Sequence, residues 1–292
     1  MMTYLDYARR GANDWWRFVV AFGLAMVFWT AMIVLLVAAL FIARLPVSQF
    51  GAWISDTSRP VSFFGFNGLA FLMLVVAFAA AIRWVQHKRF QNLIGAWTWR
   101  RFGAGFGVWT IALVAASLLD FALAPHGFRA SACANTLPLA ISALAGLGIQ
   151  TFAEEFIFRG YLTQGLLLAI RRPLPVALIS GLLFGALHIP NGPPQAVNAV
   201  FFGVILALIA MRTGGIAFTY GLHLANNLFS AVVVVSSKDV FGGSPALFTQ
   251  NTPGLMWWDT GVGAVALIVL ALMMDRIPWR PSGAAEPAGD AA

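Results

Sequence analysis

The chain has 292 residues, of which 60% are hydrophobic, 14% are aromatic and only 10% are charged. Soluble domains carry about 25% charged residues, so this composition excludes an ordinary soluble protein and indicates a chain that lies in a lipid bilayer. The net charge of +7 does not indicate nucleic acid as a partner, because basic residues in membrane proteins gather in cytoplasmic loops and meet anionic lipid there. A single cysteine, Cys133, excludes an internal disulfide.

Uncharged apolar runs of about 20 residues mark the expected transmembrane helices. The first run is about twice as long as the apolar region of a signal peptide, so we expect it to be retained. Proline and glycine divide the long uncharged run after residue 172 into successive helices. The sequence predicts an all-α polytopic membrane protein with about eight transmembrane helices, at residues 18–43, 60–82, 102–119, 137–170, 174–189, 195–211, 216–235 and 260–274.

The distribution of Lys and Arg predicts the orientation of these helices. An even number of spans places both termini on one side, where thirteen Lys and Arg residues fall, against four on the other side. Both termini are therefore expected to be cytoplasmic. Residues 84–101 are basic and rich in Trp, and they predict an interfacial helix with Trp84, Trp97 and Trp99 at headgroup depth.

The remaining segments complete the expected domain organisation. Residues 236–258 are rich in turn-forming residues and predict a long loop. The chain is expected to divide into a cytoplasmic segment at 1–17, the N-terminal transmembrane helices at 18–135, a membrane core with the polar motifs at 136–275, and a disordered tail rich in Pro, Ala and Gly at 276–292.

Two of the three glutamates, Glu154 and Glu155, are adjacent within an apolar helix. An ionisable side chain in a span costs a few kcal/mol, so the pair needs a partner or a function. Glu155 and Arg159 are four residues apart and are expected to pair, whereas Glu154 points about 100° away and lacks that partner. Glu154 therefore suits a general base or acid, although all three side chains can equally form one structural ion cluster.

Two of the four histidines, His188 and His223, also lie within predicted spans. His223 and Asn227 are one turn apart and share a helix face, and Asn226 is expected to point away from that face. A glutamate and two histidines can hold a water molecule and accept its proton, or they can bind a metal ion such as zinc. An Asn can donate to the oxyanion that forms when water attacks a peptide carbonyl, so amide hydrolysis uses every member of the set.

Three motifs on successive helices carry a resemblance to a known family. They are Glu154-Glu155-x-x-x-Arg159, Phe184-x-x-x-His188 and His223-x-x-x-Asn227. Their order and spacing resemble the motif series of the CPBP intramembrane protease family, which includes the type II CAAX prenyl endopeptidases and the Abi or bacteriocin-immunity proteins. The match covers residues 140–235 and implies an eight-helix fold with a core of four motif-bearing helices and a cavity open to the membrane interior.

The resemblance also implies roles for individual residues. Glu154 activates a water molecule, His188 and His223 bind that water or, with Glu154, a zinc ion, and Asn227 stabilises the oxyanion. The supporting residues are Glu155, Arg159 and Phe184. The implied substrate is a membrane-associated peptide or protein, which eukaryotic members cleave after prenylation.

Two classes of function remain open at the level of sequence. The first is an intramembrane endopeptidase of this type. The second is a non-proteolytic immunity or regulatory protein, or a small transporter, in which the same polar cluster is structural. The short loops and the basic cytoplasmic face are typical of a bacterial protein, so we expect the chain in the bacterial inner (cell) membrane.

Overall fold

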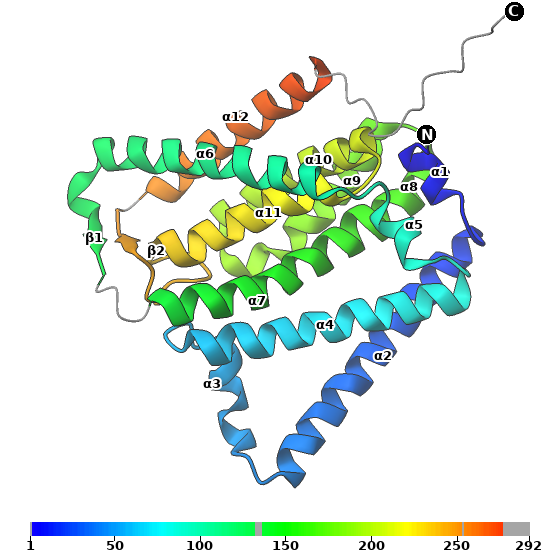
Figure 1. The fold of residues 1–292 in the computed structure, drawn as a ribbon, viewed down its shortest axis with the longest axis horizontal. Helices are drawn as coiled ribbons and strands as arrows, with labels where there is room; N and C mark the ends of the chain where they lie inside the picture. Colours follow the sequence, from blue (N-terminus) through cyan, green and yellow to red (C-terminus); the bar gives the residue numbers. More distant parts are fainter. Residues whose placement is uncertain (1, 132–135, 253, 277–292) are drawn as a thin grey trace, which may run out of the picture.

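The computed structural model describes residues 2–131, 136–252 and 254–276, and the fold is helical with one small sheet (Figure 1). The N-terminal helices are α1 (Tyr4–Ala8), α2 (Trp15–Ile42), α3 (Phe50–Ser55), α4 (Pro60–Val85), α5 (Phe90–Ile94) and α6 (Trp99–Leu123). The C-terminal part contains α7 (Thr136–Glu155), the π-helical segment η4 (Phe156–Leu162), α8 (Thr163–Ile170), α9 (Pro173–Leu187), α10 (Pro193–Thr213), α11 (Ala217–Leu228), the π-helical segment η6 (Phe229–Val233) and α12 (Leu255–Arg276). Short 3₁₀ turns lie at Val47–Gln49, Pro125–Gly127 and Ile189–Asn191.

Six helices in the described part of the chain are long and apolar enough to cross a membrane. They include α2 with 28 residues and the continuous helix Thr136–Ile170 with 35 residues. Large apolar side chains on their outer faces are exposed, such as Leu35, Ile42 and Ile111, as expected for surfaces that meet lipid.

The expectation of eight membrane-spanning helices is therefore met only in part. The helices that carry His188 and His223 are the two that fall short, because α9 has 15 residues and α11 has 12. The apolar sequence of α9 ends at the turn Ile189–Asn191, and α11 passes into the π-helical segment η6. A span of the hydrocarbon core needs about 20 residues, so neither helix reaches that length by itself.

Glycines allow α9, which carries the second motif, to pack closely against α10. A Cβ atom added to Gly203 of α10 would lie 2.5 Å from the Cα atom of Gly181 in α9. One turn further along α9, a Cβ atom at Gly185 would lie 3.0 Å from the carbonyl oxygen of Ala196. Larger residues would separate the two helices and move His188 away from the centre of the bundle.

Two parts of the chain differ from the prediction. Residues 84–101 do not form one helix, because α4 continues to Val85, α5 covers only Phe90–Ile94, and α6 begins at Trp99. The segment 236–258 is not only a loop. Strands β1 (Phe128–Ala130), β2 (Val234–Ser236) and β3 (Phe248–Gln250) form a sheet in the order β1-β3-β2, in which β3 is antiparallel to β1 and parallel to β2.

The sheet closes one end of the helical bundle, and α1 lies at the opposite end (Figure 1). Helix α12 begins at the sheet end, next to the C-terminal end of α6. The predicted disordered tail at 276–292 falls almost entirely outside the described residues.

Candidate functional site

Glu154 and Glu155 occupy the last turn of α7, where the helix widens into the π-helical segment η4. The predicted pair with Arg159 forms, since Arg159 Nη1 lies 3.0 Å from Glu155 Oε1 and both side chains are fully buried. Single π-helical turns within α-helices are frequent at functional sites, and this one sets the direction of the side chains that follow the two acids.

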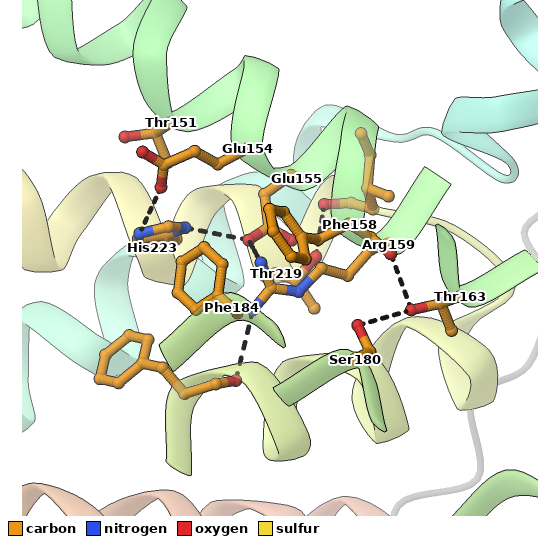
Figure 2. Close-up of polar contacts among 12 residues, drawn as sticks. Thr151, Glu154, Glu155, Phe158, Arg159, Thr163, Ser180, Phe184, Thr219 and His223 are labelled. Atoms are coloured by element: carbon orange, nitrogen blue, oxygen red, sulfur yellow. Dashed lines mark hydrogen bonds and ion pairs between the residues drawn. The ribbon is translucent and has the colours of Figure 1, made fainter. Parts of the chain in front are cut away.

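Arg159 is held on several sides (Figure 2). Its Nη2 atom donates to the carbonyl oxygen of Phe202 at 3.4 Å, and its guanidinium group lies 4.6 Å from the ring centroid of Phe184. The hydroxyl of Tyr4 in α1 donates to the backbone carbonyl of Arg159. Phe184, a residue of the second motif, therefore acts as the ring beneath the buried cation.

His223 connects the two adjacent glutamates (Figure 2). Its Nδ1 atom lies 2.9 Å from Glu155 Oε1, and its Nε2 atom lies 3.5 Å from Glu154 Oε2. A carboxylate only accepts hydrogen bonds, so the short contact places the proton of a neutral imidazole on Nδ1 and leaves the lone pair of Nε2 facing Glu154. Arg159, Glu155, His223 and Glu154 thus form one continuous chain of contacts.

Glu154 has a polar neighbour at each of its two carboxylate oxygens. Gln150, one turn earlier in α7, donates from Nε2 to Glu154 Oε1 at 3.2 Å. With His223 on its other oxygen, Glu154 is not without a partner, although it lacks a positively charged one. Its side chain is 14% exposed, whereas that of Glu155 is 0% exposed. Only one of the adjacent acids therefore reaches solvent or substrate.

His188 caps the C-terminal end of α9. Its Nδ1 atom lies 2.8 Å from the carbonyl oxygen of Phe184, one turn earlier, and the two rings are 4.6 Å apart between centroids. Because a carbonyl oxygen only accepts, Nδ1 carries the proton in this contact and Nε2 remains available as an acceptor or ligand. The spacing Phe-x-x-x-His thus fixes the tautomer of His188.

The amide of Asn227 lies beside the last turns of α7, where Nδ2 donates to Thr151 Oγ1 at 3.0 Å. The prediction that Asn226 points away from the site is wrong. Asn226 Nδ2 donates to Asn227 Oδ1 at 3.3 Å, and Trp109 Nε1 of α6 donates to Asn226 Oδ1 at 3.2 Å. Asn227 is therefore oriented by Thr151 and, through Asn226, by Trp109. The contacts of Thr151 and Trp109 join different helices, so residue spacing within a single helix does not predict them.

These side chains surround a cavity of about 580 Å³. Its wall includes Glu154, His188, His223 and Asn227, the four residues that the sequence singled out for catalysis. Glu155 and Arg159 do not contribute to the wall and lie behind it. The structure therefore separates a set of polar side chains that face the cavity from a buried ion pair that supports one of them.

The proposed zinc ligands do not form a metal centre in this arrangement. The part of the chain that the structure describes contains no group of three or more His, Cys, Asp or Glu side chains that could hold a metal ion. His223 uses Nδ1 on Glu155, and its Nε2 lies 3.5 Å from Glu154 Oε2. The expectation of a site made by Glu154, His188 and His223 is thus not supported by their placement.

Comparisons with known proteins agree with the motif series. The family model for "Type II CAAX prenyl endopeptidase Rce1-like" proteins matches residues 135–229. The chain is 31% identical over 279 residues to the "Uncharacterized protein YyaK" of Bacillus subtilis (strain 168), an alignment that covers 90% of this chain and 93% of that protein. No solved structure matches the chain.

Proposed function

Because the chain belongs to the Rce1-like type II CAAX prenyl endopeptidase (CPBP) family, we propose that it is an intramembrane endopeptidase that hydrolyses a peptide bond of a membrane-associated peptide or protein. The observation that carries this proposal is the contact between Glu154 and His223. A carboxylate and an unprotonated imidazole nitrogen are both acceptors, so they repel each other unless one donor beside the pair bonds to both. At 3.5 Å, Glu154 Oε2 and His223 Nε2 are arranged to accept the two protons of one water molecule.

The proposed reaction begins when Glu154 takes a proton from that water, whose oxygen then attacks the carbonyl carbon of the peptide bond. The developing oxyanion accepts a hydrogen bond from Asn227. An amide nitrogen carries two protons, and Asn227 uses one on Thr151, so the second remains for the oxyanion. Glu154 then gives its proton to the leaving nitrogen as the oxyanion collapses and the carbon–nitrogen bond breaks, which yields a carboxylic acid and an amine.

The remaining residues support this set. Glu155 holds the Nδ1 proton of His223 and so directs Nε2 towards Glu154, and Arg159 balances the charge of Glu155. His188 contributes Nε2 from the opposite helix as a second acceptor for the water or as a donor to the substrate when protonated. No step in this scheme requires a metal ion.

We propose the bacterial cell membrane as its location, with both termini in the cytoplasm. The six apolar helices, the relative from Bacillus subtilis and the excess of basic residues on the side of the termini support this orientation. Reporter fusions at the N-terminus and in the segment after β2 test it, because the two positions are expected to lie on opposite sides.

The test of the proposed function is Glu154→Gln, which keeps the size of the side chain and the hydrogen bond from Gln150 but removes the base. Membranes of a bacterial host that expresses either form are compared by mass spectrometry for new peptide termini. We expect termini that depend on the wild-type chain and that Glu154→Gln lowers at least about 10³-fold. Ser117→Ala, at another part of the cavity wall, serves as the matched control and is expected to retain them.

Two results would refute the proposal. One is the same set of termini from the Glu154→Gln protein at equal abundance. The other is the absence of any terminus that depends on the wild-type chain, which would favour a non-proteolytic immunity, regulatory or transport function for the same polar cluster.

A further inference from the structure

The cavity is acidic well beyond the catalytic set. Three aspartates, Asp120, Asp239 and Asp259, line it together with Glu154. These are four of the eleven acidic residues of the chain, whereas none of its eighteen Lys and Arg residues lines the cavity in the described part of the structure. The protein as a whole has a net charge of +7, so the cavity wall is negative although the chain is basic.

The three aspartates come from different elements, whose ends lie at the sheet end of the bundle (Figure 1). Asp120 lies near the C-terminal end of α6, Asp259 near the start of α12, and Asp239 in the segment between β2 and β3. On α6, Trp109 contacts Asn226 beside the catalytic set and Asp120 lies eleven residues further on. At 1.5 Å per residue this separation is about 16 Å, which an extended peptide covers in about five residues.

Among the residues that the structure describes, no Lys or Arg forms an ion pair with Asp120, Asp239 or Asp259. The side chains of Asp120 and Asp259 are in hydrogen-bond contact with each other. Two carboxylates at this distance repel each other unless a proton or a cation lies between them. Asp239 accepts a hydrogen bond from Gln195 Nε2 of α10 at 2.8 Å, and burial raises the pKa of Asp239 to about 6. It is therefore mostly ionised at neutral pH.

A second and independent feature at the same end fits the backbone of a peptide. Gln250 of β3 is only 5% exposed and lines the cavity, and its Nε2 donor has no partner among the described residues. Gln195 also lines the cavity and uses Nε2 on Asp239, and within the described part of the chain its Oε1 acceptor has no partner. Buried polar groups without partners are rare in proteins, and a free amide donor and a free amide acceptor together match the alternating groups of a peptide backbone.

We infer that the sheet end of the cavity is a specificity subsite for a cationic segment of the substrate, in which Asp120, Asp239 and Asp259 bind Lys or Arg side chains and Gln250 and Gln195 bind the peptide backbone. The distance along α6 places the basic residues about three to five positions from the cleaved bond. This inference rests on the proposed function for the identity of the ligand as a peptide substrate.

Binding to the Glu154→Gln protein tests the subsite without cleavage. The probes are a fluorescein-labelled peptide with an apolar segment followed by a cluster of Arg residues, and the same peptide with citrulline in place of each Arg. The protein is held in nanodiscs of neutral phosphatidylcholine, so that lipid charge does not attract the probe, and fluorescence anisotropy gives the affinity. We expect the Arg peptide to bind at least about tenfold more tightly than the citrulline peptide.

Charge-removing variants locate the effect. In the same background, Asp239→Asn and the double change Asp120→Asn/Asp259→Asn are each expected to reduce the preference for the Arg peptide about tenfold. Asp56→Asn is the matched control, because Asp56 lies at the same end of the bundle, pairs with Arg59 at 3.3 Å and does not line the cavity. Gln250→Leu is expected to weaken both peptides alike, since backbone contacts do not depend on charge.

Several outcomes would overturn the inference. Equal affinities for the Arg and citrulline peptides, or no binding of either peptide, would do so. So would an effect of Asp56→Asn as large as that of the cavity aspartate variants. Displacement of the Arg peptide by equimolar spermidine would show a site for small cations instead. A failure of the proposed function looks different, because wild-type protein would then bind the Arg peptide selectively and leave it uncleaved. The swap between Arg and citrulline changes only the probe, so it remains informative if an aspartate variant does not fold.

Discussion

The buried pair of Arg159 and Glu155 offers the sharpest test of how the site is supported. Arg159→Met keeps an unbranched side chain of similar length but removes the positive charge. In the structure both side chains are 0% exposed, and their closest atoms are 3.0 Å apart. The change would leave Glu155 buried with the neutral partners His223 and Thr219 but no cation, and it would remove the cation above the ring of Phe184.

The size of the effect follows from this geometry. For two unit charges at 3.0 Å, Coulomb's law gives about 5.5 kcal/mol at an effective dielectric constant of about 20. Removal of one member of a buried ion pair costs about 3–5 kcal/mol in soluble proteins. We therefore expect Arg159→Met to lower the free energy of unfolding by about 3–5 kcal/mol. Arg83→Met, at an exposed arginine in the last turn of α4, should change it by less than about 1 kcal/mol.

Reversible unfolding in mixed micelles of detergent and dodecyl sulfate measures these free energies. The informative comparison is the double variant Glu155→Gln/Arg159→Met, which removes both charges and should recover most of the lost stability. It should not recover peptidase activity, because the carboxylate that orients His223 is gone. If Arg159→Met is as stable as the wild type, or if the double variant is less stable than Arg159→Met, the charge-balancing role assigned to Arg159 is wrong.

The remaining predictions concern activity. Glu155→Gln should reduce kcat about 10²–10⁴-fold with little change in KM, because an amide no longer holds the Nδ1 proton of His223 in the same way; steady-state kinetics on a cleaved peptide measure both constants. Asn227→Ala should reduce kcat about 10²–10³-fold through loss of an oxyanion donor, as single-turnover rates would report. The preference for an Arg peptide over its citrulline counterpart should decrease as pH falls from 7 to 5. Asp239, which faces the acid Asp259, has a raised pKa of about 6 and therefore loses its negative charge in this range.

Each of these predictions has a result that contradicts it. A Glu155→Gln protein that changes only KM would place Glu155 in substrate binding instead of in the support of His223. Full activity of Asn227→Ala would assign the oxyanion to another donor, and Asn226→Ala is the control that separates loss of the donor from loss of its orientation. A preference for the Arg peptide that is constant between pH 7 and 5 would exclude Asp239 from the subsite. The preference is the ratio of the values measured for the two peptides at one pH, so the pH dependence of the catalytic residues, which acts on both peptides alike, cancels.

The transmembrane helices could be predicted closely because insertion into lipid depends mainly on local composition. Predicted residues 60–82 correspond to Pro60–Val85, and predicted residues 18–43 correspond to Trp15–Ile42. The errors at the helix ends come from Trp and Arg, which interrupt an apolar run although the helix continues through them. The three strands could not be predicted in this way. Each has three residues, and β1 pairs with a strand more than a hundred residues later, so no alternating pattern develops.

The site shows the same limit at the level of side chains. Helical spacing predicted the pair of Glu155 and Arg159, because both residues lie on one helix face. The spacing did not predict that His223 from α11 contacts both glutamates, or that Trp109 from α6 turns Asn226 towards Asn227. These contacts depend on how separate helices are packed, which local periodicity does not encode.

The distribution of charge connects the catalytic set to the proposed subsite. Arg159 is buried behind the cavity wall and is used by Glu155, so it does not balance the carboxylates that face the cavity. Within the described part of the chain, the cavity wall contains Glu154 and three aspartates but no Lys or Arg side chain. A cationic peptide would therefore supply the positive charge that the wall lacks, and it would do so a few residues away from the bond that Glu154 is positioned to hydrolyse. Binding energy from that remote segment can then position the reacting carbonyl group, which makes the acidic end of the cavity a determinant of turnover as well as of affinity.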